Sequence, residues 1–353
     1  MALKYIQGFD SNTIFNEKWT TLGTTTLSPS YARIPGVGQG LYHQSTGSPV
    51  YLNTSGMGLS AANGSTIIFG VANKLISTGT DQQWVCIKYN AATGANYHHI
   101  LVFANTTSNT YTIASSDSTT WIGTTPSVGN IRDWHYIEFK ITFHDTAGSV
   151  EVRLNGASTP FFSVTGVKTK QPGQNNIGAI WFGDRDNASL GYGYTFYLDD
   201  FYLCDDTGTT NNDFLGECRV ETLVPTSDTS TNEFVPSTGT DHFALVDETT
   251  SSTADYLTST IVGQKELFNV TDLSNTPAII YGVQATAYMG KTNIGPKQAK
   301  ILVNSNSTES ASDAIDLNTS PIAYTMLLET NPDGNIAWDQ TSIDAIQIGV
   351  ESV

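Results

Sequence analysis

The stretch "DWHYIEFKITFHDTAGSVEVRLNG", residues 133–156, constrains the fold more than any other part of the chain. Its apolar residues recur at every second position, as Ile137, Phe139, Ile141 and Phe143 and then, after "DTAG", as Val150, Val152 and Leu154. A period of two indicates strands that bury one face. The stretch therefore predicts a β-hairpin, and "NG" at 155–156 predicts a tight turn after it.

The pairing of the two strands can be predicted from this pattern. If residues 145–148 form the loop, the apolar side chains pair as Phe143 with Val150, Ile141 with Val152 and Phe139 with Leu154. On the other face Glu138 lies diagonal to Arg153 and Lys140 to Glu151, which predicts exposed charge pairs worth about a few tenths of a kcal/mol each. We therefore interpret the hairpin as architecture and not as the wall of a cleft.

The rest of the chain predicts an all-β protein. Strand-like stretches recur at 66–71, 83–89, 99–104 and 195–203, and loops rich in Gly, Asn, Ser and Thr separate them. A chain of 353 residues exceeds one ordinary domain. The apolar pattern lapses at "DDTGTTNNDFLG". We expect a jelly-roll sandwich over 1–205, a linker over 206–216 and a second, smaller β-sandwich over 217–353, with a short helical turn at 341–344.

Composition excludes several classes of partner. Sixteen Lys and Arg against thirty-three Asp and Glu give a net charge of 16 − 33 = −17, which repels phosphate backbones and anionic membranes. No apolar run is long enough for a membrane helix, and the first ten residues lack the apolar core of a signal peptide. Three widely spaced cysteines predict free, mostly buried thiols. We expect neither nucleic-acid binding nor membrane insertion.

The hairpin resembles the concanavalin A-like, laminin-G-like jelly-roll superfamily. The matching features are Trp134, His135, the paired strands and Asn155-Gly156, and "FYLDDFYL", with Asp199 and Asp200, looks like its closing strand. The resemblance covers residues 1–205 and implies a jelly-roll fold. The superfamily contains lectins, glycosidases, polysaccharide lyases and structural modules, so the resemblance does not select one activity.

The second half resembles a segment of structural proteins from tailed bacteriophages. The resemblance is carried by "NNDFLGECRVETLVPTSDTSTNEFVPSTGTDHFALVDE" and "NPDGNIAWDQTSIDAIQIGVES". It implies a virion protein that assembles in the cytoplasm of the host bacterium, which fits a sequence with an extracellular character and no signal peptide. The partners implied are other capsid or tail proteins and further copies of the chain in a homo-oligomer.

Ligand-binding candidates lie in the loop "WFGDRDNASLGYGYT". Trp181, Tyr192 and Tyr194 are aromatic residues that could stack on the apolar face of a pyranose ring from a host surface glycan. Asp184, Asp186 and Asn187 place oxygen ligands close together, as Ca²⁺ prefers, although the Gly and distal Glu of a full calcium loop are missing. A plain turn and core packing are the structural alternatives for these residues.

Catalysis finds little support in the sequence. The Glu-X-Asp-X-X-Glu run of one large group of jelly-roll glycosidases is absent, and no Ser-His-Asp order or paired Cys motif stands out. We expect a non-enzymatic structural protein on the outer surface of a tailed phage, as a capsid decoration or a tail or fibre component, that binds host glycans. The alternatives are a polysaccharide hydrolase or lyase and a secreted lectin.

Overall fold

The computed structural model describes residues 2–44, 48–77, 82–90, 98–115, 120–183 and 195–353. The chain divides into two compact units. The first contains Met1–Asp10 and Lys18–Val220, and the second contains Ser11–Glu17 and Glu221–Val353. The expected linker, 206–216, thus lies inside the first unit.

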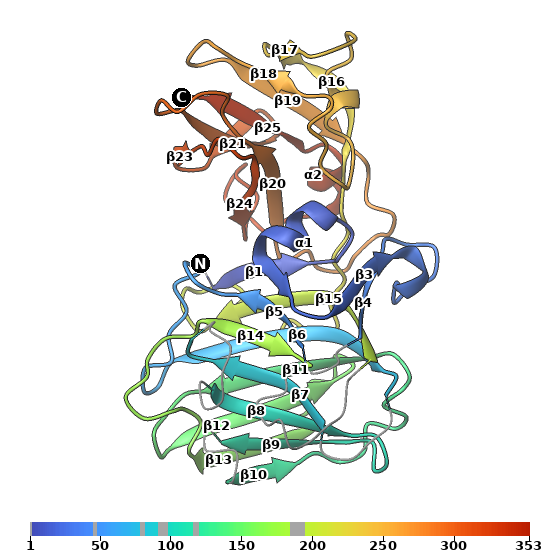
Figure 1. Cartoon of the computed structure of the whole chain (residues 1–353), viewed down its shortest axis with the longest axis vertical. Helices are drawn as coiled ribbons and strands as arrows, with labels where there is room; N and C mark the ends of the chain where they lie inside the picture. The colour runs from blue at the N-terminus through green and yellow to red at the C-terminus, as the bar shows by residue number, and fades with distance from the viewer. Residues whose placement is uncertain (1, 45–47, 78–81, 91–97, 116–119, 184–194) are drawn as a thin grey trace. The chain divides into compact units, whose positions relative to one another are not determined.

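The first unit contains two antiparallel sheets (Figure 1). The eight-stranded sheet has the order β13-β12-β11-β6-β15-β4-β3, and β1 also pairs with β15. Its strands are β1 (Leu3–Gln7), β3 (Thr24–Ser28), β4 (Gly40–Gln44), β6 (Thr66–Leu75), β11 (His135–Thr142), β12 (Gly148–Leu154), β13 (Phe162–Val167) and β15 (Thr195–Asp205). Each sheet combines strands that are distant in the sequence, as the long connections of a jelly roll require.

The seven-stranded sheet has the order β10-β9-β8-β7-β14-β5-β2. Its strands are β2 (Trp19–Thr21), β5 (Val50–Asn53), β7 (Gln82–Lys88), β8 (His98–Asn105), β9 (Thr110–Ser115), β10 (Trp121–Thr124) and β14 (Ala179–Phe182). Aromatic side chains join the two sheets. The ring of Trp84 lies 6.2 Å from that of Phe139, and Trp19 lies 5.5 Å from Phe201. The core of the first unit is therefore the space between the sheets.

The β11–β12 hairpin forms with a register that differs from the prediction. Ile141 pairs with Val150, Phe139 with Val152 and Ile137 with Leu154, a shift of two residues. Because the shift is even, every apolar side chain keeps its face. Phe143 leaves the hairpin because its N–H donates to the Ser65 carbonyl (2.8 Å) and its carbonyl accepts from Gly64 (2.8 Å).

A loop centred on His144 fixes this register. The His144 Nδ1 accepts hydrogen bonds from the backbone N–H groups of Thr146 (3.1 Å) and Ala147 (2.9 Å). The imidazole therefore satisfies two backbone donors at the turn between the strands. The wider loop moves β12 along β11 by one apolar pair relative to the predicted four-residue turn.

The outer face of the eight-stranded sheet is covered where the sequence predicts a solvated one. Glu138 is fully buried, and its Oε1 accepts hydrogen bonds from the Tyr202 hydroxyl (2.5 Å) and the Gly216 N–H (2.8 Å). Burial raises the pKa of this carboxyl. The predicted exposed pairing of Glu138 with Arg153 is therefore wrong, since Arg153 Nε binds Glu151 (2.9 Å) instead.

The segment 206–220 provides this cover. The Leu215 N–H donates to the Tyr202 hydroxyl (3.2 Å), and the Val220 N–H donates to Asp200 Oδ1 (2.9 Å). The Phe214 ring lies 4.0 Å from the guanidinium carbon of Arg153. We name residues 206–220 the strap, because their backbone is bonded to β15 and β11.

The second unit is a smaller β structure with a six-stranded sheet of order β16-β19-β25-β21-β22, in which β23 pairs with β21. These strands are β16 (Pro225–Asn232), β19 (Lys265–Val270), β21 (Gln298–Ser305), β22 (Thr308–Ala311), β23 (Ile315–Asp316) and β25 (Gln347–Ser352). Two further pairs join β17 (Val235–Pro236) to β18 (Leu257–Thr258) and β20 (Val283–Met289) to β24 (Ile322–Leu328).

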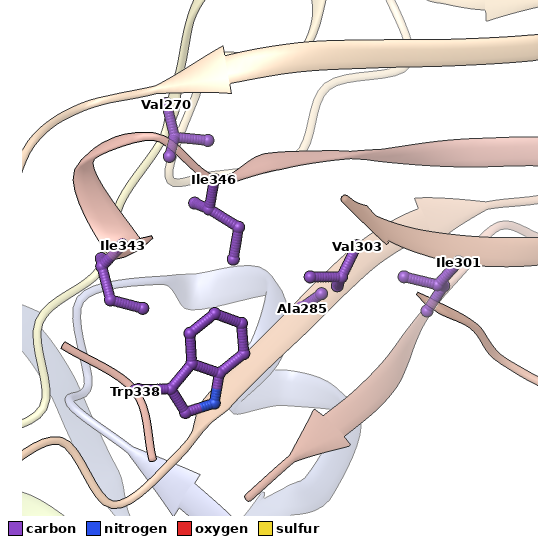
Figure 2. Close-up of a cluster of buried hydrophobic side chains, with 7 residues drawn as sticks. All are labelled: Val270, Ala285, Ile301, Val303, Trp338, Ile343 and Ile346. Atoms are coloured by element: carbon purple, nitrogen blue, oxygen red, sulfur yellow. The ribbon is translucent and has the colours of Figure 1, made fainter. Parts of the chain in front are cut away.

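The core of the second unit lies between the β20–β24 pair and one face of the six-stranded sheet. Figure 2 shows its buried side chains, which are Val270, Ala285, Ile301, Val303, Trp338, Ile343 and Ile346. Trp338 packs in this core, and its Nε1 donates to the Leu328 carbonyl (3.2 Å). The expected all-β class, a jelly-roll sandwich followed by a smaller β-sandwich, is confirmed.

Short helices complete the described chain. These are α1 (Asn12–Lys18), η1 (Pro29–Tyr31), η2 (Phe243–Leu245) and α2 (Gln340–Asp344). The helical turn predicted at 341–344 is confirmed, but its N-cap is Asp339, which forms a capping box with Ser342. In the described part of the chain, no helix has the length and apolar character to cross a membrane. Cys86, Cys204 and Cys218 form no disulfide bond, and Cys86 and Cys204 are buried.

Candidate functional site

Most of the site residues predicted from sequence lie outside the described residues. This applies to Tyr192 and Tyr194 and to the calcium candidates Asp184, Asp186 and Asn187. In the part of the chain that is described, no three His, Cys, Asp or Glu side chains gather to hold a metal ion. The calcium prediction therefore stays a prediction.

Trp181 lies in the interior of the first unit. Its side chain is 1% exposed and packs with Cys86, Leu101 and Phe103. The Tyr51 ring stacks on it at 4.6 Å, and the Lys88 Nζ lies 3.8 Å from its ring centroid. The neighbouring Phe182 faces the other sheet, with its ring 6.3 Å from that of Phe201, so Trp181 lies on the opposite face of the seven-stranded sheet. Trp181 is buried there, and its predicted contact with a ligand stays a prediction.

The strands of the seven-stranded sheet carry no acidic residue. Neither Asp nor Glu occurs in any of the seven ranges that the structure assigns to this sheet. Glycoside hydrolysis uses two carboxyl groups that flank the scissile bond. The described strands of this sheet therefore offer no such pair.

An accessible group of aromatic side chains lies on the eight-stranded sheet. Tyr197 of β15 is paired with Tyr42 of β4 on one side and with Lys74 of β6 on the other. The rings of Tyr42 and Tyr197 are 5.5 Å apart, and the Lys74 Nζ lies 5.8 Å from the Tyr197 centroid. All three side chains are half-buried, so part of each faces solvent. Cross-strand pairing thus places two tyrosines and a lysine in one row.

Two further rings enlarge this group. Tyr31 of η1 stacks on both other tyrosines, at 5.2 Å from Tyr42 and 5.3 Å from Tyr197. Trp134, directly before β11, lies 6.2 Å from Tyr197. Tyr31 and Trp134 are also half-buried. We name Tyr31, Tyr42, Trp134 and Tyr197 the aromatic platform.

Local sequence explains why Tyr31 reaches the platform. The Ser28 side chain caps η1 by accepting a hydrogen bond from the Ser30 N–H, and Pro29 occupies the first turn. The backbone of η1 runs close over β4, because a Cβ on Gly40 would lie 2.0 Å from the Tyr31 carbonyl oxygen. Glycine at position 40 therefore permits the approach of η1 to the sheet.

Polar side chains border the platform on the same face. Thr26 of β3 is paired with Tyr42, and the neighbouring row contains Thr24, Gln44 and Thr195. Thr24, Thr26 and Gln44 are exposed. Hydroxyl and amide groups both donate and accept hydrogen bonds, as the hydroxyl groups of a sugar require. The row thus combines ring faces with sugar-compatible polar groups.

A buried acidic pair holds η1 in place. The Arg33 N–H donates to Asp199 Oδ2 (2.8 Å), and the Arg33 Nη1 binds Asp200 Oδ2 (3.2 Å). The remaining oxygens accept from the backbone, since Asp200 N–H donates to Asp199 Oδ1 and Val220 N–H to Asp200 Oδ1. These carboxylates are engaged in structure and are not open to a ligand.

Burial governs the titration of this region. Burial first, and then the charge of Asp200, raise the pKa of Asp199 to about 8. Burial also raises the pKa of Tyr197, with smaller contributions from Tyr31 and Tyr42. The Tyr197 hydroxyl therefore stays protonated at neutral pH and remains a hydrogen-bond donor.

The sequence contained only part of the signal for the platform. The alternation in "GLYHQ" and "TFYL" places Tyr42 and Tyr197 opposite the buried residues of their strands. The sequence does not show that β4 and β15 are neighbours or that η1 folds over them. This arrangement depends on pairing between segments about 150 residues apart in the sequence. Trp134 stands out in the sequence only through the family resemblance of the hairpin.

No family model matches the chain, and no curated protein matches it. Several solved structures are similar to it. The cellulose-induced protein Cip1 is 14% identical, with 60% of this chain and 100% of that chain covered and a TM-score of 0.39. The catalytic domain of a GH131 β-glucanase from Podospora anserina is 13% identical, with 59% and 97% covered and a TM-score of 0.37.

The exoplasmic domain of VIP36, in a form bound to Ca²⁺ and Man3GlcNAc, is 10% identical, with 60% of this chain and 93% of that chain covered and a TM-score of 0.36. Sequence identity of this order does not transfer an activity between proteins that share an architecture. The function of this chain is therefore argued from the chemistry of its own residues.

Proposed function

We propose that the protein is a non-enzymatic structural component on the outer surface of a tailed-phage virion and that its first unit binds host surface glycans through the aromatic platform. The observation that carries glycan binding is the group of four half-buried rings, Tyr31, Tyr42, Trp134 and Tyr197. Ring faces that are held in place by cross-strand pairing bind the apolar face of a pyranose with little loss of conformational entropy.

The polar border favours a neutral or acidic sugar. Thr24, Thr26 and Gln44 are exposed beside the rings, and Lys74 places a cation in the row. Lys74 would bind a carboxylate or phosphate substituent of a bacterial polysaccharide. Asp199 and Asp200, on the same strand as Tyr197, are buried and bonded to backbone groups, whereas Asp133, directly before Trp134, is exposed.

The non-enzymatic part of the proposal rests on carboxylate placement. The described strands of the seven-stranded sheet carry no Asp or Glu, and the two buried acids on the strand of Tyr197, Asp199 and Asp200, are already bonded. A hydrolase needs two carboxyl groups with access to the same bond. The competing proposal, a polysaccharide hydrolase or lyase, would need such a pair in contact with the bound sugar.

The virion part of the proposal rests on the resemblance of residues 211–248 and 331–352 to phage structural proteins. Capsid and tail proteins would then be the partners, in a homo-oligomeric arrangement, and the virion would be the place of action. Quantitative mass spectrometry of purified phage particles tests this part. Absence of the chain from the particles, with the chain present in the culture supernatant, would favour the secreted lectin.

A glycan array of bacterial polysaccharides tests binding, and calorimetry on the best ligand measures affinity. Tyr197→Ala removes the central ring of the platform and should weaken binding by about tenfold or more. Trp121→Ala is the matched control, because Trp121 is 54% exposed on a strand of the other sheet. It should leave the affinity within about twofold of wild type.

Two results would contradict the proposal. Equal losses of glycan affinity in Tyr197→Ala and Trp121→Ala would show that the glycan does not bind specifically at the platform. Release of reducing ends or of unsaturated sugars from the bound polysaccharide would show an enzyme. Circular dichroism of each variant separates loss of binding from loss of fold.

A further inference from the structure

Exposed apolar side chains gather in one part of the second unit. Val235, Tyr256, Ile261 and Val262 are all more than half exposed, and Val262 is 75% exposed. Val235 of β17 is paired with Thr258 of β18, and Tyr256 lies two residues from Thr258 on the same side of the strand. Ile261 and Val262 follow in the turn after β18. We name these four residues the apolar tip.

The backbone of the tip is fixed. The Tyr256 N–H donates to Ser237 Oγ (2.9 Å), and the Ser237 N–H donates to the Tyr256 carbonyl (2.9 Å). The Ile261 carbonyl accepts from the Ser259 hydroxyl (3.0 Å) and from the Ser352 hydroxyl (2.6 Å). The apolar side chains are therefore presented on a preformed surface, which lowers the entropy cost of binding a partner.

The tip stands in a strongly acidic part of the chain. No Lys or Arg occurs between Arg219 and Lys265. The acidic residues in that interval are Glu221, Asp228, Glu233, Asp241, Asp247, Glu248 and Asp255. Glu233, Asp241 and Glu248 are exposed. Glu233 lies two residues before Val235, and Asp255 directly precedes Tyr256, so carboxylates lie next to the tip along the chain. An apolar surface next to carboxylates differs from an ordinary solvated face, where apolar side chains occur singly.

We infer that the apolar tip is the docking surface for a different protein chain whose binding segment combines basic and aliphatic side chains. Aliphatic groups of the partner would cover Ile261 and Val262, and its Lys or Arg side chains would meet the surrounding carboxylates. A second copy of this chain is a poor occupant, because it would bring the same acidic residues against each other. This inference is independent of glycan binding by the first unit.

The experiment uses the full chain and synthetic peptides as probes. A labelled peptide of alternating Leu and Lys is compared with peptides of alternating Leu and Glu and of alternating Ser and Lys. Fluorescence anisotropy should show binding of the first peptide only, with the other two weaker by about tenfold or more, and the affinity should fall as NaCl is added.

Variants locate the binding. The double variant with Ile261→Ser and Val262→Ser should bind the Leu–Lys peptide with an affinity about tenfold or more below that of the wild type. Asp255→Asn, beside Tyr256, should weaken it by about twofold to fivefold at low salt. Ile294→Ser is the matched control, because Ile294 is 97% exposed in the loop after β20 and outside the tip. It should change the affinity by less than about twofold.

Three outcomes would overturn the inference. One is Leu–Lys binding that is equal in the wild type and the tip variant, or no binding at all. Another is a wild-type dimer in sedimentation velocity that becomes a monomer in the tip variant, which would assign the tip to a second copy. The third is binding of phosphatidylcholine vesicles through Ile261 and Val262, which would assign it to a lipid surface. Circular dichroism confirms that each variant remains folded.

Discussion

The two units of this chain have different cores and different charges. In the first unit β6 is buried along nearly its whole length, whereas β25 in the centre of the second unit is half-buried at every position. The first unit has 12 Lys and Arg and 15 Asp and Glu, a net charge of 12 − 15 = −3. The second has 4 and 18, a net charge of 4 − 18 = −14. The acidity of the chain is therefore a property of its second unit.

This difference bears on the two roles that we propose for the units. A fully buried core gives a rigid base on which cross-strand pairs hold exposed rings. A half-buried sheet with excess negative charge repels itself and gains from contact with a partner of opposite charge. These properties fit the proposed roles, glycan recognition for the first unit and contact with a partner chain for the second.

The largest effect is expected when one core residue in each unit is truncated. Ile137→Ala removes a fully buried side chain of β11 and should lower the free energy of unfolding by about 3–4 kcal/mol. Ile348→Ala removes a half-buried side chain of β25 and should cost about 1–2 kcal/mol. Urea unfolding measures both. Equal losses would show that the second core is as tightly packed as the first.

A test of intermediate size is the pH dependence of the first unit. The raised pKa of Asp199 means that the folded state holds a proton between about pH 4 and about pH 8 that the unfolded state releases. Stability should therefore fall as the pH rises through this window, by on the order of a few kcal/mol.

Asp199→Asn should flatten this slope, because the side chain no longer titrates. Asp206→Asn, at an exposed acid of the same unit, is the control and should keep the wild-type slope. Urea unfolding at several pH values provides the measurement. A slope that is unchanged in Asp199→Asn would assign the pH dependence to other groups.

The smallest test is ionic strength. Raising NaCl from about 0.05 M to about 0.5 M shortens the Debye length and screens the repulsion within the second unit. The free energy of unfolding should rise by about 1 kcal/mol or less for the second unit and by a smaller amount for the first. Calorimetry at several NaCl concentrations measures the unfolding of both units. A larger rise for the first unit would show that the difference in net charge does not govern the response to salt.

The sequence predicts the class of fold because period two alternation is a local signal. The strands around Phe139 and Val152 formed as expected, and their apolar faces point to the core. It does not predict register, because a shift of two residues keeps every apolar side chain on the same face. The choice between registers came from the His144 loop and from the pairing of Phe143 with Ser65.

The candidate site was less predictable than the fold. Trp181 is aromatic and precedes a Gly-rich loop, yet its side chain is buried against residues such as Cys86 and Tyr51. Tyr31, Tyr42 and Tyr197 come from three separate segments, and only the order of the strands brings their rings together. Strap residues such as Gly216 look like a polar linker in the sequence, but backbone hydrogen bonds place them on the sheet.

The place of α1 in the second unit has a consequence for the order of synthesis. Residues 11–17 leave the ribosome before residues 18–220, but they belong to a unit whose other residues begin at Glu221. The side chain of Asn12 reaches its partner Thr250 (3.4 Å) only after all residues of the first unit have been made. The second unit therefore completes its fold late, after the first unit has had time to form its core on the nascent chain.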